Sequence, residues 1–144
     1  MAEGNGAIYN NFKEQILLGE MDLGNAADVI KMILVSGYTP DIDAHQVYAD
    51  VSGDEYGTAL GYTANGATLA NQAVAQDDAN DRATFNGDDV LWAGLGPLVP
   101  ATPSHCILYD TTFDCLIAYW ELGTTATNGG DYTLQFGATI MNLT

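Results

Sequence analysis

The sequence contains very little positive charge. Apart from two histidines, its only basic residues are Lys13, Lys31 and Arg82, against 19 acidic residues, and the formal net charge is −16. Proteins that bind nucleic acid or anionic membranes need lysine and arginine side chains to neutralise phosphates. The charge balance therefore argues against direct contact with either partner. It also predicts a surface that repels other copies of itself, less strongly as the salt concentration rises.

Long apolar runs and cysteines are scarce as well. The longest apolar stretches, such as Cys115–Trp120, are far too short to cross a bilayer. The first residues, MAEGNGA, lack the basic start and apolar stretch of a signal peptide, and we expect none. Cys106 and Cys115 can in principle form a disulfide. We expect instead that they are small buried side chains on neighbouring strands.

The composition is nevertheless that of a folded domain. The chain has 144 residues, of which 47% are hydrophobic, and we expect a single β-rich domain over residues 1–144. Ile8, Phe12 and Ile16 lie four residues apart, and this spacing predicts a helix over about residues 6–19, ending at Gly19. Such a short helix is not stable alone. Its apolar side must pack on the body of the domain or on a neighbouring subunit.

The rest of the chain predicts short strands. The expected strands are Val29–Val35, which is apolar on both faces, the weaker Gly66–Ala75, then Arg82–Asn86, Val90–Trp92, His105–Tyr109, Cys115–Trp120 and Tyr132–Phe136, with Ile140 on the same parity. The predicted turns are Asp77–Asp81 and the hairpin connection Asp110–Asp114. Seven or eight short strands predict a mainly β fold, an antiparallel β-sandwich or barrel with one short N-terminal helix.

Acidic clusters raise the question of a metal site. The segment Asp77–Asp81 resembles a calcium loop, which needs oxygen ligands at alternate positions and a central glycine. Counted from Asp78, however, Arg82 stands at the fifth position and Ala83 where the glycine belongs. The template fails, and a solvated turn between strands is the simpler interpretation. We expect no bound metal.

Catalytic templates also fail. Asp41 and Asp43 beside His45 are better explained by a turn after a proline than by cation binding. His105 and Cys106 are adjacent, and adjacent side chains of a strand point to opposite faces. A pairing of His45 with Cys106 has no support in the sequence, and no phosphate-binding glycine loop is present. We therefore expect neither an enzyme nor a cofactor.

Aromatic side chains are the remaining candidates for a binding surface. They are Tyr38, Tyr48, Tyr56, Tyr62, Trp92, Tyr119 and Trp120. Such residues can form a platform for sugar rings, or they can serve core and intersubunit packing, in which amphipathic aromatic groups are also favoured. Packing is the favoured interpretation.

One ordered series of segments covers nearly the whole chain. It runs IKMILVSGYTPDIDAH (30–45), ADVSGDEYGT (49–58), GYTANGATLANQAV (61–74), DDANDRATFNGDDVLWAG (77–94), HCILYDTT (105–112), LIAYWELG (116–123) and YTLQFGATIMNL (132–143). This series resembles a family of small tailed-bacteriophage virion structural proteins. The chain departs from the pattern at GLGPLVPATP (94–103), where the family has an alternating strand.

The resemblance implies a capsid decoration, or cement, protein. Such a protein sits on the outer surface of the assembled shell and bridges neighbouring major capsid subunits, commonly as a trimer or another symmetric oligomer. We expect the N-terminal helix and the loops from Tyr38 to Tyr62 to form the contact surface, because they hold apolar and aromatic groups on marginal elements. The expected contact residues are Ile8, Tyr9, Phe12, Tyr38, Tyr48, Tyr56 and Tyr62. Two alternatives stay open, namely a tail or head–tail connector protein and a carbohydrate-binding module on the virion surface.

Overall fold

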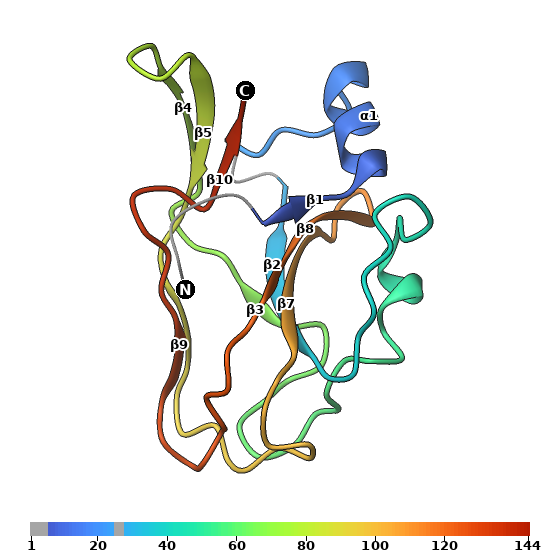
Figure 1. Ribbon diagram of the computed structural model, residues 1–144, viewed down its shortest axis with the longest axis vertical. Coiled ribbons are helices and arrows are strands. Elements are labelled where there is room, and N and C mark those ends of the chain that lie inside the picture. Colours follow the sequence, from blue (N-terminus) through green and yellow to red (C-terminus); the bar gives the residue numbers. More distant parts are fainter. Residues whose placement is uncertain (1–5, 25–27) are drawn as a thin grey trace.

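The structure, a computed structural model, describes residues 6–24 and 28–144 and is mainly β (Figure 1). Its elements are β1 (Ala7–Ile8), α1 (Asn10–Leu18), β2 (Ile30–Val35), the 3-10 turn η1 (Tyr48–Asp50), β3 (Ala67–Thr68), β4 (Ala73–Asp77), β5 (Arg82–Asn86), β6 (Val90–Trp92), β7 (His105–Asp110), β8 (Cys115–Glu121), β9 (Tyr132–Leu134) and β10 (Met141–Leu143). The prediction of a mainly β fold with one helix near the N-terminus is confirmed. The described residues contain ten short strands, more than the seven or eight expected.

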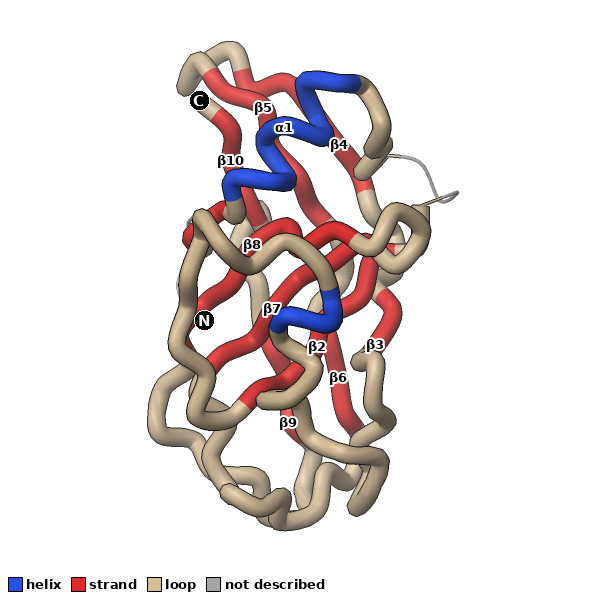
Figure 2. Tube along the Cα trace, turned by 90° about the vertical axis from the view of Figure 1, so that its right-hand side faces the viewer, coloured by secondary structure: helices blue, strands red, loops and turns tan. Residues whose placement is uncertain are grey.

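The strands form three antiparallel sheets. A five-stranded sheet has the order β1-β8-β7-β2-β3, a three-stranded sheet the order β10-β5-β4, and β6 pairs with β9. Each sheet is open at both edges within the described residues, so the structure resembles the sandwich alternative and not the barrel. The strands of the two smaller sheets lie to one side of β2 and β7, and the long segment that contains η1 lies to the other (Figure 1). In the view of Figure 2, α1 crosses in front of β10, β5 and β4.

The five-stranded sheet is buried on both faces. In β2, Met32 and Leu34 belong to the first core cluster, which also contains Phe85 and Met141 of the three-stranded sheet. The alternate residues Ile33 and Val35 point to the opposite face and join a second cluster with Tyr9, Tyr38 and Val51. Full burial of one such aliphatic side chain contributes roughly 1.5–3 kcal/mol to folding. The apolar run of β2 is thus explained by its central place in the sheet.

The N-terminal helix begins later than predicted. Ala7 and Ile8 form β1, where they pair with Tyr119 and Ala118 of β8, so α1 begins only at Asn10. Its end is as predicted, because Gly19 adopts the left-handed conformation (φ 73°) and donates its backbone N–H to the Ile16 carbonyl. Phe12 is buried in the first cluster, so the helix packs on the body of its own chain. At nine residues it is too short to cross a membrane, and no longer apolar helix occurs in the described ranges.

Local backbone geometry explains one further difference and the path of the chain beside β2. The predicted strand 66–75 is split into β3 and β4, because Asn71 between them has a positive φ of 53°. Gly66 precedes β3 with φ +76°, and a Cβ there would lie 2.2 Å from the carbonyl oxygen of Met32. Only glycine lets the chain approach β2 so closely.

The C-terminal part also differs from the expected pattern. β9 ends at Leu134, and the chain then turns to form β10, which pairs with β5. The Gly/Pro-rich segment 94–103 contains no strand, although Leu95 and Leu98 insert into the first cluster. Cys106 and Cys115 are buried, as expected, on the neighbouring strands β7 and β8, and no disulfide joins them.

Candidate functional site

The residues expected to contact a partner lie mostly in the interior. Five of the seven, Tyr9, Phe12, Tyr38, Tyr56 and Tyr62, are at most 6% exposed in the single chain. Ile8 and Tyr48 are half-buried. The five buried side chains are core residues and are not available to a partner, so the prediction is wrong for them. Its physical error was to assign aromatic residues in a long connection to the surface, whereas Tyr38 belongs to the second core cluster and Tyr56 and Tyr62 belong to the first.

Hydrogen bonds account for the polar ends of these tyrosines. The hydroxyl groups of Tyr9 and Tyr38 lie 2.7 Å apart, and the Tyr38 hydroxyl is also 2.8 Å from Nδ1 of His45. The Tyr62 hydroxyl donates to the Glu55 carboxylate (2.7 Å) and accepts the backbone N–H of Leu34 (3.0 Å). These bonds fasten the segment around η1 to the sheet. Their geometry indicates a structural role.

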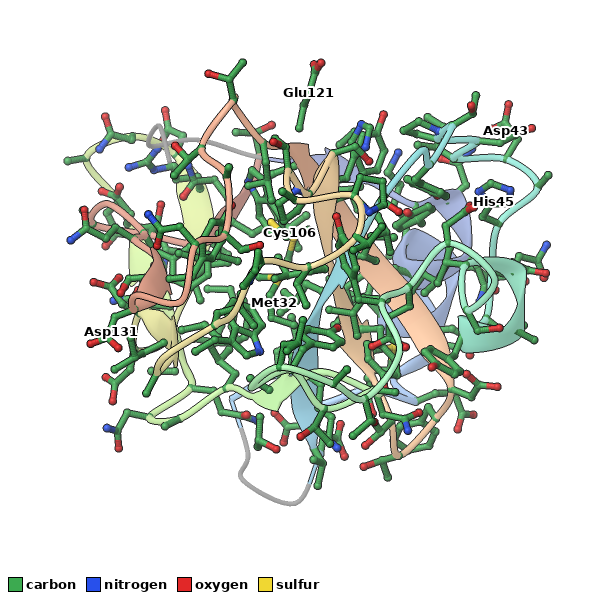
Figure 3. All side chains as sticks on the ribbon, turned by 90° about the horizontal axis from the view of Figure 1, so that it is seen from below. Met32, Asp43, His45, Cys106, Glu121 and Asp131 are labelled. Atoms are coloured by element: carbon green, nitrogen blue, oxygen red, sulfur yellow. The ribbon has the colours of Figure 1, made fainter. Side chains whose placement is uncertain are left out.

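The catalytic pair considered from the sequence is not formed. His45 contacts Tyr38 in the second cluster, whereas Cys106 belongs to the first cluster, on the other side of the sheet. Figure 3 shows Cys106 in the middle of the molecule and His45 at its periphery. Burial raises the pKa of the Cys106 thiol to about 12, which keeps it protonated and weakly nucleophilic at neutral pH.

The two acidic segments are turns. Asp77 forms an ion pair with Nε of Arg82 at 2.8 Å and accepts hydrogen bonds from the Asn80 amide. Asp41 accepts the backbone N–H groups of Asp43 and Ala44, the pattern of an Asx-type turn predicted after Pro40. Residues 6–24 and 28–144 contain no group of three or more potential metal-ligating side chains.

The aromatic side chains do not form an exposed platform. Tyr38, Tyr56, Tyr62, Trp92 and Trp120 are buried. Tyr48 and Tyr119 are half-buried, and they lie against Tyr109 and Tyr9 respectively. Packing, the interpretation favoured from the sequence, is what the structure shows for these residues.

An apolar hollow of about 300 Å³ lies between α1, the segment that follows it and the three-stranded sheet. We call it the α1–β5 groove. It is lined by Ile16, Met21, Asp22, Leu23, Val74, Ala83, Thr84, Phe85, Met141 and Leu143. Apart from Asp22 and Thr84, its lining is hydrophobic. A lining of this composition is suited to bind apolar groups.

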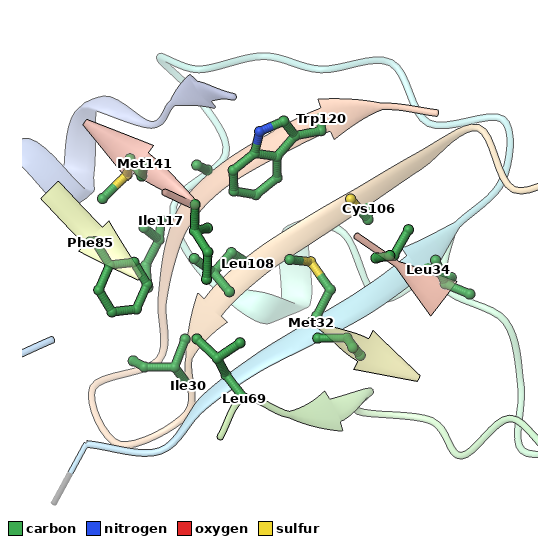
Figure 4. Packing of buried hydrophobic residues seen from close by; sticks show 14 of the residues in the cluster. Ile30, Met32, Leu34, Leu69, Phe85, Cys106, Leu108, Ile117, Trp120 and Met141 are labelled. Atoms are coloured by element: carbon green, nitrogen blue, oxygen red, sulfur yellow. The ribbon is translucent and has the colours of Figure 1, made fainter. Parts of the chain in front are cut away.

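The strand register explains the floor of the α1–β5 groove. Val74, Phe85 and Met141 are direct cross-strand partners on β4, β5 and β10, so their side chains form one row on the same face. Ala83 and Leu143 belong to the next row on that face. Phe85 and Met141 close the floor against the core, where Figure 4 shows them side by side. Val74, at the outer strand, is 53% exposed.

The surroundings of the α1–β5 groove are acidic. Asp22 belongs to its lining, and the exposed Asp78 and Asp81 line a shallower hollow that shares Ala83 and Leu143 with it. Arg82, the cationic side chain that lines this shallower hollow, forms an ion pair with Asp77. The groove therefore combines apolar walls with a rim of carboxylates.

Sequence reasoning missed this site for a physical reason. Its residues come from four distant stretches, and the pairing of β10 with β5 brings the C-terminal end of the chain to its floor. The one local signal was that Val74 is apolar in a strand of small and polar neighbours.

Comparison with known proteins identified no relative of this chain. No family model matches the chain, and neither a curated protein nor a solved structure is significantly similar to it.

Proposed function

We propose that this protein is a phage capsid decoration protein, which binds the outer surface of the assembled major-capsid lattice and stabilises it. The observation that carries the proposal is the α1–β5 groove, an apolar and partly exposed hollow on a β-rich domain whose buried tyrosines serve internal packing. This combination suits binding better than turnover. The resemblance of the ordered segments to small virion structural proteins supports a lattice as the partner.

The proposed mechanism is mass action. A protein that binds only the assembled lattice, and not the free subunits, lowers the free energy of the assembled state. The stabilisation grows with the free concentration of the bound protein relative to its dissociation constant. Bridging neighbouring subunits in this way opposes the outward pressure of packaged DNA.

The charge of the chain bears on the proposed homo-oligomer. Each copy carries −16, so the copies repel one another at low ionic strength and less at high ionic strength. We expect trimers to form at the symmetry axes of the shell, where capsid subunits hold the copies together, and monomers in dilute low-salt solution. Sedimentation velocity at low and high salt measures the oligomeric state of the protein in solution.

The decisive experiment mixes the purified protein with shells that lack it. Bound density at the lattice symmetry axes, together with a higher melting temperature of the shells, is the expected result. Shells that neither bind the protein nor gain stability would contradict the proposal. Copy number separates decoration from the tail or connector alternative, because a decoration protein is present in hundreds of copies per particle.

A further inference from the structure

We propose that the α1–β5 groove binds an apolar polypeptide segment flanked by lysine or arginine residues, and that this segment belongs to the partner protein. The inference rests on the proposed function for the identity of the partner. The chemistry of the segment follows from the groove itself. Its apolar side chains would enter the hollow, and its basic residues would meet the acidic rim.

Several apolar side chains that line the groove, and two at the end of α1, are exposed to solvent. Val74 is 53% exposed on the floor, and Ile16 and Leu143 are half-exposed. Leu17 and Leu18, at the end of α1, are 87% and 63% exposed, but they do not line the groove. Contiguous apolar surface rimmed by polar residues is typical of an interaction site, whereas single exposed apolar residues are common on any surface.

Its size is suited to side chains. About 300 Å³ corresponds to the liquid volume of roughly ten water molecules, at the lower end for a small-molecule pocket. A few aliphatic side chains fill such a hollow and displace water that has few polar partners there. Release of that water favours an apolar occupant.

Charge decides which apolar segment fits. Asp22 stands in the lining, and Asp78 and Asp81 lie beside it. The nearby cation Arg82 forms an ion pair with Asp77. Its positive charge therefore does not neutralise the carboxylates of Asp22, Asp78 and Asp81. A second copy of this chain brings a further −16 and is disfavoured as the occupant. A segment with basic flanks is attracted, and more strongly at low salt.

Peptide binding tests the groove independently of the capsid. The probes are two fluorescent peptides with the same alternating leucine and serine centre, one flanked by lysines and the other by glutamates. Fluorescence anisotropy measures their affinity for the full chain. The lysine-flanked peptide should bind at least about tenfold more tightly, and its affinity should fall as salt rises. Equal affinities, or no binding of either peptide, would overturn the proposal.

Two variants localise the binding. Val74→Glu places a charge on the groove floor, and Leu91→Glu is the matched control, because Leu91 is 54% exposed on β6, outside the groove. Val74→Glu should lower the affinity for the lysine-flanked peptide about tenfold or more, and Leu91→Glu should change that affinity by no more than about twofold. Melting curves of both variants establish that each is folded. Equal effects of the two substitutions would refute the assignment to the groove.

Charge reversal at the rim tests the electrostatic part. In the double variant Asp78→Lys, Asp81→Lys, the preference should shift toward the glutamate-flanked peptide. An unchanged preference would refute the role of the rim.

Shell binding by the same variants separates the two proposals. If wild-type protein binds shells and Val74→Glu binds equally well, the groove is not the contact, and the decoration function stands. If peptides bind in the groove but shells are not bound, the groove assignment stands and the decoration function fails.

Discussion

Val74 and Phe85 face each other across β4 and β5, yet Val74 is 53% exposed and Phe85 only 3%. Phe85 belongs to the core, and Val74 continues the same row toward solvent. Phe85→Ala should therefore lower the free energy of unfolding by about 3–5 kcal/mol, and Val74→Ala by about 1 kcal/mol or less. Urea denaturation measures both. A comparable loss in Val74→Ala would mean that Val74 is covered in solution.

The buried carboxyl group of Asp110 should make the stability of the protein depend on pH. Asp110 is fully buried at the end of β7, and its Oδ2 atom has no hydrogen-bond partner within the described part of the chain. Burial raises the pKa of its carboxyl group, and the negative charge of Asp28 adds to the increase. The folded state therefore holds the proton more tightly than the unfolded state. This contribution to stability is complete below the ordinary pKa and is lost as pH rises through the folded pKa.

Asp110→Asn should stabilise the protein near pH 8 by about 1 kcal/mol or more, because it removes a buried charge while its Oδ1 still accepts the N–H groups of Thr112 and Phe113. The gain should disappear at acid pH. Melting temperatures across the pH range measure both effects, and the exposed Glu14→Gln is a control that removes one charge. A variant no more stable than wild type near pH 8 would contradict the prediction.

Buried tyrosines predict unfolding in alkali. Burial raises the pKa of Tyr9 and Tyr62, and burial with the nearby Glu55 raises that of Tyr109 to about 12. Protonated tyrosine is thus favoured in the folded state, so stability should fall as pH rises above about 10, the ordinary pKa. Absorbance of tyrosinate should show Tyr9 and Tyr62 titrating only together with unfolding. A single transition of all eight tyrosines in the folded protein would be the contrary result.

The cysteines should be unreactive in the native protein. Burial raises the pKa of Cys106 to about 12 and that of Cys115 to about 11, so little thiolate exists at pH 8. A thiol reagent should modify neither residue in the folded chain and both after denaturation. Rapid modification before unfolding would contradict their burial, and no modification after unfolding would indicate a disulfide.

The sequence predicted the elements whose cause is local. The buried β2, the hairpin at Asp110–Asp114 and the helix end at Gly19 each follow from a short pattern of apolar, turn or glycine residues. Elements that depend on pairing with residues far away in the sequence were predicted less well. Ile8 fits a helical spacing, and only its pairing with Ala118 of β8 draws it into a strand.

The candidate site also depends on contacts between distant parts of the chain, which local sequence patterns do not reveal. Whether an aromatic residue is buried depends on what the long segment before β3 covers, and no local pattern records that. Tyr38 and Tyr62 were therefore placed at the surface and are core residues. The α1–β5 groove arises only when β10 pairs with β5, because Met141 and Leu143 come from a different part of the chain than Val74.

Hydrogen exchange of the protein on and off purified shells tests the central claim most directly. If the α1–β5 groove docks on the capsid, backbone amides in β4, β5 and β10 and in the segment 16–23 should exchange more slowly on the shells, because binding covers them. The part of the chain around η1 should exchange at an unchanged rate. Protection confined to the η1 side, or no protection anywhere on shells that carry the protein, would contradict the account.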